Sequence, residues 1–255
     1  MVMNRDAEKS LAAQHHPAAI RERLGNPAKQ NAISDAVLGG IDGCVTTFAV
    51  VSGVIGAGLP PAVALVLGFA NLMADGFSMA ISNYESIKAA GEFAQSVRAS
   101  EAAHIDRIPA GEREEIRQIF QQKGFSGEVL ESIVDTISAD RRLWIDTMLT
   151  EEHGIPGTNR DPVRAALTTF AAFIGVGAIP LLPFMVPGLD RNPQFALSAC
   201  LAAIMFFSIG AMKSRIFHKP VFRSGLGTLL TGGGAAALAF LVGHLLREIT
   251  GIGAI

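Results

Sequence analysis

The chain has 255 residues and a mass of 26.8 kDa; 49% of its residues are hydrophobic and only 17% are charged. Soluble domains carry about 25% charged residues and disordered chains carry few apolar ones, so the composition excludes a disordered chain. The net charge of -2 excludes the overall positive field of a nucleic-acid-binding protein, and no such module is visible. Cys44 and Cys200 lie in apolar runs, which favours core residues over a disulfide or a zinc site.

Four long stretches of the sequence contain no Asp, Glu, Lys or Arg. They cover residues 43–74, 165–189, 192–212 and 224–246. A run of 18 or more apolar residues is typical of a transmembrane helix, because about 20 residues at a rise of 1.5 Å cross the hydrocarbon core. The sequence therefore predicts an all-α, polytopic membrane protein.

Five membrane helices are expected, at residues 33–58, 61–88, 162–186, 193–213 and 225–247. The first apolar stretch is too long for one crossing, and its Gly and Pro residues at 56–61 predict two helices joined by a tight hairpin. Short loops rich in Lys and Arg stay in the cytoplasm. The basic segments before residue 33, at 88–164 and at 213–223 all fall on one side, so we expect a cytoplasmic N-terminus and a C-terminus outside.

A polar insert with helical periodicity separates the second and third membrane helices. The second membrane helix is expected to continue to about residue 108, followed by helices at 112–123 and 128–152 that are separated by glycine-containing breaks. The last helix is amphipathic, and its apolar face packs on either the neighbouring helices or a second subunit. We expect a cytoplasmic N-terminal segment (1–32), two membrane helices (33–90), a cytoplasmic helical domain (91–160) and three membrane helices (161–255).

Polar side chains recur along the first two membrane helices, where such groups are energetically expensive and usually mark an ion or proton path. Asp35 and Asp42 are seven residues apart on one face of the first helix, and Asp75, Met79 and Asn83 are spaced by four on the second. Carboxylate and amide oxygens suit hard divalent cations, and a thioether shifts the preference toward transition metals. The alternatives are that Asp35 is merely interfacial and that Met79 only fills the core.

The cytoplasmic insert carries a second set of possible metal ligands at helical spacing. They are Glu101 and His104, Glu112 and Glu115, and Met148 and Glu152. Residues three or four apart share a helix face, so each pair can present a two-ligand edge and the edges can converge. The alternative is that these glutamates are simply the solvated faces of amphipathic helices.

Two other classes of function compete with a metal path through the membrane. A membrane-anchored metal sensor or storage protein would use the glutamates of the insert, but it would not need Asp42, Asp75 and Met79 along adjoining membrane helices. An enzyme is not expected, because no nucleophile and base pairing, HExxH motif or phosphate-binding loop is present. The spacing of Gly39 and Gly43 favours close helix packing over phosphate binding.

These motifs resemble the vacuolar iron transporter family of Fe2+/Mn2+ transporters. Residues 34–43 (SDAVLGGIDG) are similar to the DAVLGxxDG signature of that family, and residues 78–80 (SMA) are similar to its second-helix element. The spacing of the glutamates, His104 and Met148 in the insert is similar to the metal-binding cytoplasmic helices of the family. His104 stands where the family usually has Glu, Asn83 replaces a Gly-Glu-aromatic element, and Asp75 occupies a position that is usually small.

The resemblance implies roles for individual residues and for the whole chain. Asp42 and Met79 would bind metal in the transport pathway, with Asp35 nearer its entrance, and the ligands of the insert would bind metal in the cytoplasm and pass it on. Family members are homodimers that exchange metal for protons. The implied function is export of Fe2+ or Mn2+ from the cytoplasm across the cell (inner) membrane, with the metal as substrate and no prosthetic group.

Proton exchange also has a physical basis in the residues themselves. A bound dication favours the ionised form of a carboxylate, so metal binding should release protons wherever a membrane carboxylate is protonated beforehand. Asp42 and Asp75 are the candidates for this exchange.

Overall fold

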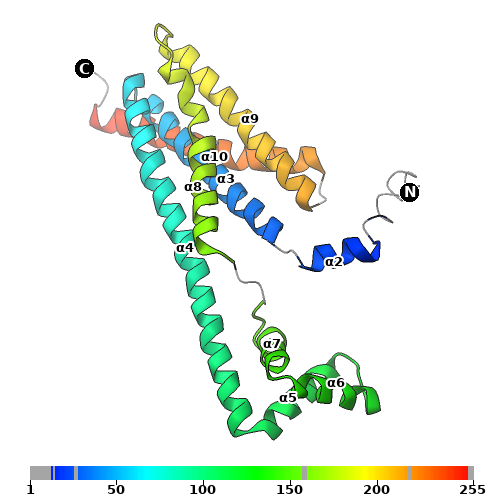
Figure 1. The fold of residues 1–255 in the computed structure, drawn as a ribbon. Helices are drawn as coiled ribbons and strands as arrows, with labels where there is room; N and C mark the ends of the chain where they lie inside the picture. The colour runs from blue at the N-terminus through cyan, green and yellow to red at the C-terminus, as the bar shows by residue number, and fades with distance from the viewer. Residues whose placement is uncertain (1–12, 14, 26–27, 157–159, 218–219, 252–255) are drawn as a thin grey trace. The chain divides into compact units, whose positions relative to one another are not determined.

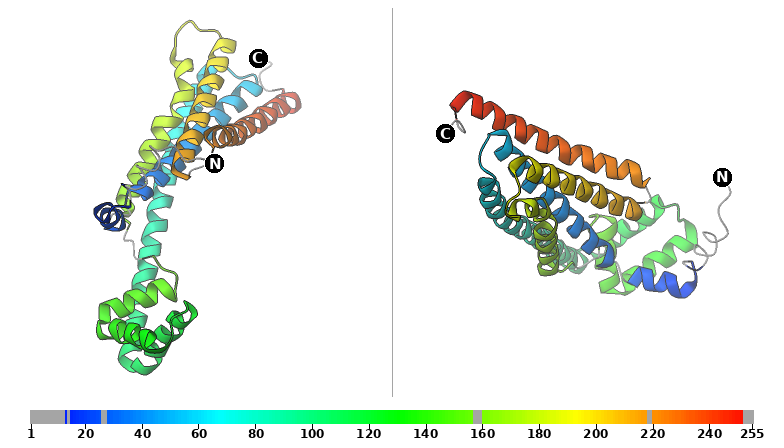
Figure 2. Two further views of the ribbon diagram at one scale, coloured as in Figure 1. Left: turned by 90° about the vertical axis from the view of Figure 1, so that its right-hand side faces the viewer. Right: turned by 90° about the horizontal axis from the view of Figure 1, so that it is seen from above.

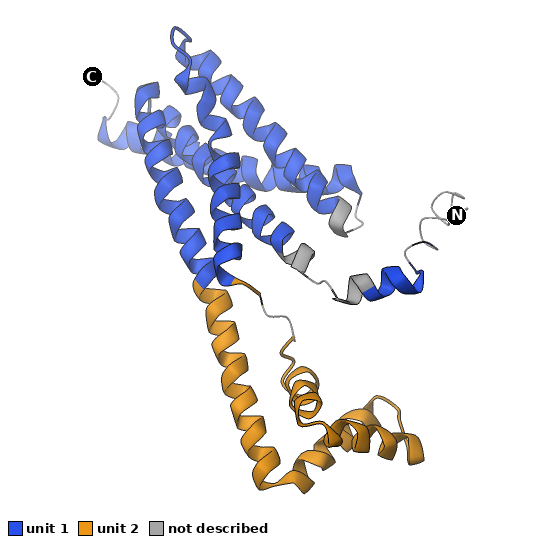
Figure 3. Ribbon diagram, viewed as in Figure 1, with its two compact units in different colours: residues 1–84, 162–255 blue, residues 85–161 orange. Residues whose placement is uncertain are grey.

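The computed structural model describes residues 13, 15–25, 28–156, 160–217 and 220–251. Much of the expected N-terminal segment (1–32) and the last four residues of the chain therefore lie outside the described residues. All regular elements in the described ranges are helices (Figure 1), as the uncharged runs predict. The chain divides into two compact units, one formed by residues 1–84 and 162–255 and the other by residues 85–161 (Figure 3).

Unit 1 contains the apolar helices. They are α3 (Ala28–Gly56), the first part of α4 (Pro61–Arg107), α8 (Pro162–Gly177), the 3-10 helix η1 (Ile179–Met185), α9 (Arg191–Phe217) and α10 (Val221–Thr250), with the short α2 (Pro17–Gly25) before them. Helices α3, α4, α9 and α10 are each long and apolar enough to cross a membrane, and α8 with η1 makes a fifth span if the bent pair is counted as one. The expected hairpin is present, because α3 ends at Gly56 and α4 begins at Pro61.

The third expected membrane helix, at 162–186, is not one continuous helix. It ends at Gly177, and the chain continues as η1 at an angle of 41°. Pro180 and Pro183 explain the break, because proline has no N–H to donate and its ring clashes with the preceding turn. The Pro180 carbonyl instead accepts a hydrogen bond of 2.7 Å from the buried Ser198 hydroxyl of α9.

Glycines allow α3 to approach its neighbours closely. A Cβ atom on Gly39 would lie 2.2 Å from the Thr169 carbonyl oxygen, and one on Gly43 would lie 2.4 Å from the Phe173 carbonyl oxygen, so both face the α8 backbone. Gly56 meets α10 in the same way, with 2.3 Å to the Phe240 carbonyl oxygen. Helices α9 and α10 lie side by side (Figure 2). Small residues at such crossings are the usual device for packing membrane helices.

Unit 2 consists of the end of α4, α5 (Pro109–Gln122), α6 (Gly127–Ala139) and α7 (Arg141–Glu151). The expected single helix at 128–152 is wrong, because Asp140 is extended (φ -114°, ψ 108°) and separates α6 from α7. Its side chain accepts hydrogen bonds from the Arg142 and Leu143 N–H groups, which caps α7. The apolar faces of α6 and α7 pack within the unit, where Val134, Met148 and Ile116 are fully buried.

Candidate functional site

The candidate site residues form two groups, one in each unit. In unit 2, Glu101 and His104 lie one turn apart on α4, and Glu112 lies in the first turn of α5. Helix α4 ends at Arg107, and Pro109 starts α5 immediately afterwards, so the reversal brings Glu112 back to the face that carries Glu101 and His104. Glu152 and His153 follow the end of α7 and reach the same place.

Five acidic and imidazole side chains form one cluster in unit 2, and Glu101 lies at its centre. The Glu101 Oε1 atom is 3.2 Å from His153 Nε2 and 3.7 Å from His104 Nδ1. His104 Nδ1 is 3.5 Å from Glu112 Oε1, and His153 Nε2 is 3.6 Å from Glu152 Oε2. Glu101 thus belongs to two groups of three ligands, one with His104 and Glu112 and one with Glu152 and His153, and in each the ligand atoms lie within 4.8 Å of one another.

The two buried glutamates of this cluster are poorly satisfied by the protein alone. Glu101 is 3% exposed and Glu112 is 6% exposed, and the Oε2 atom of each is buried without a hydrogen-bond partner in the described part of the chain. A buried carboxylate oxygen without a partner is costly unless a cation or a proton satisfies it. Burial, followed by the charges of Glu115 and Glu101, raises the pKa of Glu112 to about 7.

The remaining predicted ligands of unit 2 lie around this cluster in different ways. Glu115 is an exposed residue whose carboxyl group loses part of its hydration at the edge of the cluster. This desolvation, followed by the charges of Glu152 and Glu101, raises the pKa of Glu115, so its charge interacts with the cluster. Met148 of α7 is fully buried in the apolar core, four residues before Glu152. His153 was missed by sequence reasoning, although it directly follows Glu152 at the end of the ligand-bearing helix.

In unit 1 the second group of polar residues joins three helices. Asn83 of α4 donates its Nδ2 hydrogens to Asp35 Oδ1 of α3 at 3.1 Å and to Thr169 Oγ1 of α8 at 2.8 Å. Asp35 is 5% exposed and Thr169 is fully buried. Sequence reasoning missed Thr169, which is an ordinary residue of an apolar run until the three helices are assembled.

Asp42 and Asp75 form a second polar level in unit 1. The side chains are partly buried, and the Asp75 charge acts on the Asp42 carboxyl. Seven residues of α-helix separate this level from Asp35, which corresponds to roughly 10 Å along α3. Met79 lies one turn from Asp75 and one turn from Asn83, so it falls between the two levels, where it also packs against the apolar core. Of the five predicted pathway residues, the structure joins Asp35 and Asn83 by a hydrogen bond, while Asp42, Asp75 and Met79 lie further along the same two helices.

The chain is similar to known proteins over almost its whole length. The model of the VIT family matches residues 33–244. The vacuolar iron transporter of Toxoplasma gondii is 32% identical over 97% of this chain and 86% of its own length. The vacuolar iron transporter of Plasmodium berghei is 30% identical over 96% of this chain and 94% of its own length. Vacuolar iron transporter 2 of Oryza sativa subsp. japonica is 30% identical over 85% of this chain and 88% of its own length. The chain belongs to the VIT family.

Proposed function

We propose that this protein transports Fe2+ or Mn2+ out of the cytoplasm in exchange for protons. The observation that carries metal binding is the Glu101 cluster, in which three carboxylates and two imidazoles converge within unit 2. Carboxylate oxygens and imidazole nitrogens suit both ions. The relatives named as vacuolar iron transporters support transport as the role of the whole chain.

The cluster in unit 2 is the proposed cytoplasmic metal-binding domain. Glu101 bridges two groups of ligands, so it can contact metal on either side, and the unsatisfied Oε2 atoms of Glu101 and Glu112 offer further lone pairs. A dication bound there would displace the proton from Glu112, because metal ligands bind in their deprotonated form. The exposed Glu115 and the fully buried Met148 are the remaining ligands of the proposed metal-binding domain.

The polar levels of unit 1 are the proposed route across the membrane. A divalent cation held between the carboxylates of Asp42 and Asp75 would balance their two negative charges. A carboxylate that holds either a metal ion or a proton couples the flux of one to the flux of the other. Asp35 and Asn83 form the proposed level nearer the cytoplasm, since the N-terminus of α3 lies on the side with the most Lys and Arg.

The assembly and the membrane are also part of the proposal. A homodimer would place two copies of α3 and α4 around a shared pathway, as the family resemblance implies. The N-terminus would face the cytoplasm and the C-terminus the opposite side of the cell membrane. Cross-linking in the bilayer tests the dimer, and a chain that transports metal as an isolated monomer would contradict it.

Uptake of Fe2+ and Mn2+ into proteoliposomes with an imposed pH gradient tests transport. We compare the wild type with Asp42→Ala, with the double variant Glu112→Ala/Glu115→Ala, and with the control Glu128→Ala, an exposed glutamate of α6 outside the cluster. We expect no flux with Asp42→Ala, reduced flux with the double variant and unchanged flux with the control. A dye in the lumen should report proton movement in step with metal, and flux indifferent to the pH gradient would contradict exchange.

A membrane-anchored sensor or storage protein is the second candidate function. The Glu101 cluster favours this function because all of its ligands lie in unit 2, so metal binding there requires no residue of unit 1. A sensor or storage function predicts that the wild type binds metal without transporting it, and that Asp42→Ala binds metal as the wild type does. Flux that depends on Asp42 would exclude it.

A further inference from the structure

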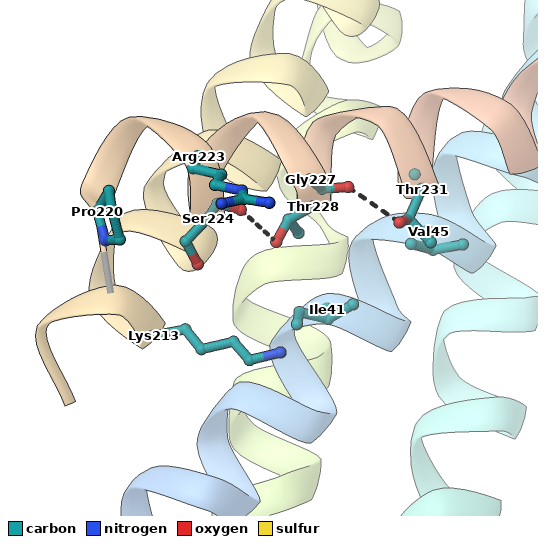
Figure 4. A pocket seen from close by; sticks show the side chains of 10 residues that line it. Ile41, Val45, Lys213, Pro220, Arg223, Ser224, Gly227, Thr228 and Thr231 are labelled. Atoms are coloured by element: carbon teal, nitrogen blue, oxygen red, sulfur yellow. Dashed lines mark hydrogen bonds between the residues drawn. The ribbon is translucent and has the colours of Figure 1, made fainter. Parts of the chain in front are cut away.

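Unit 1 contains a cavity that none of the proposed transport residues line. It has a volume of about 750 Å3 and lies between α3, α9 and α10 (Figure 4). This size falls within the roughly 300–1,000 Å3 of small-molecule sites. Ile41 and Val45 of α3 form an apolar wall of the cavity. The other lining residues are Lys213 of α9 and residues at the start and in the first three turns of α10.

The charged lining of this cavity is entirely positive. Lys213 and Arg223 both line it, and the lining residues include no Asp or Glu. Figure 4 shows Lys213 extending from α9 toward Ile41, with Arg223 close to Ser224 and Thr228 on α10. Within the described ranges, neither cation forms an ion pair with a carboxylate of the chain. Two cations that share a cavity without an acidic partner repel each other, and an anion between them would relieve that repulsion.

The start of α10 adds hydrogen-bond donors on the same side. Pro220 is the N-cap residue and supplies no side-chain hydrogen bond, so the N–H groups of the first turn lack a side-chain cap. The helix dipole favours negative charge at this position. Ser224 and Thr228 are four residues apart and line the cavity together. The Thr228 hydroxyl already donates to the Ser224 carbonyl at 3.2 Å, so the Ser224 hydroxyl is the donor of this pair that an anion would use.

The position of the cavity relates these donors to the membrane. The candidate spans run over Arg191–Ser214 and Val221–Thr250, so Lys213 and Arg223 lie at adjoining ends of two membrane helices. Cations at such ends are placed at the level of lipid headgroups, and basic pockets between membrane helices on the cytoplasmic side commonly hold anionic headgroups. Inorganic phosphate would satisfy the same cations, but it would leave the wall of Ile41 and Val45 exposed.

We propose that this cavity binds an anionic phospholipid, with its phosphate between Lys213, Arg223 and the first turn of α10 and its glycerol and first methylene groups against Ile41 and Val45. The bound lipid would contact α3, α9 and α10 together. On α3 it would contact Ile41, which directly precedes Asp42 in the sequence. The residues that line this site include none of the proposed metal ligands or transport residues, so its test needs no flux measurement.

Native mass spectrometry of the delipidated full-length protein in detergent tests the proposal. Phosphatidylglycerol, phosphatidylcholine of the same chain length and inorganic phosphate are titrated separately, and phosphate is also tested as a competitor. We expect phosphatidylglycerol to bind at least about tenfold more tightly than phosphatidylcholine, because charge-assisted hydrogen bonds are the strong ones. Millimolar phosphate should not displace it. Equal binding of the two lipids, or full displacement by phosphate, would overturn the lipid assignment.

Variants locate the binding in this cavity. Lys213→Gln/Arg223→Gln should weaken phosphatidylglycerol binding at least about tenfold, and Ser224→Ala should weaken it severalfold without altering the net charge. The matched control Lys88→Gln/Arg142→Gln removes the same charge from exposed side chains of unit 2 and should leave binding unchanged. If the double variant fails to fold, the affinity of Ser224→Ala for phosphatidylglycerol tests the location of the site. Unchanged binding in a folded cavity variant would overturn the proposal.

Discussion

Substitution of Gly43 by alanine tests the packing that holds the proposed pathway together. The added Cβ would lie 2.4 Å from the Phe173 carbonyl oxygen and 3.0 Å from the Phe173 carbonyl carbon and Cα. These are backbone atoms, so α3 and α8 must move apart by roughly 1 Å to reach ordinary contact. Overpacking of this kind costs about 1–3 kcal/mol. In a chain of this size, each kcal/mol lowers Tm by about 2–4 °C, so we expect a decrease of about 2–12 °C.

Gly175→Ala is the matched control, because a Cβ at Gly175 has no atom within 4 Å. Both substitutions gain the same helix propensity, so the difference in Tm between them isolates the contact with Phe173. Cys44 is fully buried next to Gly43, and its reaction with a maleimide dye on heating reports the opening of unit 1. The exposed Cys200 is replaced by alanine in every protein. Equal Tm values for the two glycine variants would refute the close crossing of α3 and α8.

Three further predictions concern unit 2, whose unfolding is reported by Trp144, the single tryptophan of the chain. Glu101→Gln should weaken Mn2+ binding by at least about tenfold in calorimetry, and the same affinity in this variant as in Glu128→Gln would count against Glu101 as a ligand. The pKa of Glu112, about 7, lies above its ordinary value of 4.5, so the folded unit holds a proton that the unfolded chain has released. The metal-free unit should therefore lose stability in denaturant as pH rises from about 4.5 to about 7, while Mn2+ binding strengthens over the same range, and a rise in metal-free stability would contradict this. Asp140→Ala should lower the free energy of unfolding of unit 2 by about 1 kcal/mol, because it removes the cap of α7, and no change would show that the cap is dispensable.

The membrane helices were predictable because the uncharged runs leave few alternatives. The hairpin at residues 56–61 and the close approach at Gly39 and Gly43 also followed from local sequence. The break before η1 was missed although Pro180 and Pro183 signal it, because the apolar length of 162–186 suited one crossing. The division at Asp140 was missed because helical periodicity continues through it.

The candidate site was predictable only as sets of ligand types on separate helices. Spacing could show that Glu101 and His104 share a face, but only the reversal between α4 and α5 brings Glu112 to 3.5 Å from His104. His153 lies beyond the end of α7, where helical spacing no longer predicts direction. Thr169 becomes a partner of Asn83 through a contact between residues 86 positions apart, which local sequence does not encode.

The central claim is that one chain binds metal in unit 2 and moves it through unit 1. The most direct test measures, in one reconstituted preparation, both the bound Mn2+ per chain and the initial rate of Mn2+ uptake for the wild type, Asp42→Asn and Glu101→Gln. We predict that Asp42→Asn abolishes uptake and retains metal binding in unit 2, whereas Glu101→Gln weakens binding and slows uptake without abolishing it. Wild-type uptake in Asp42→Asn would contradict the proposed pathway.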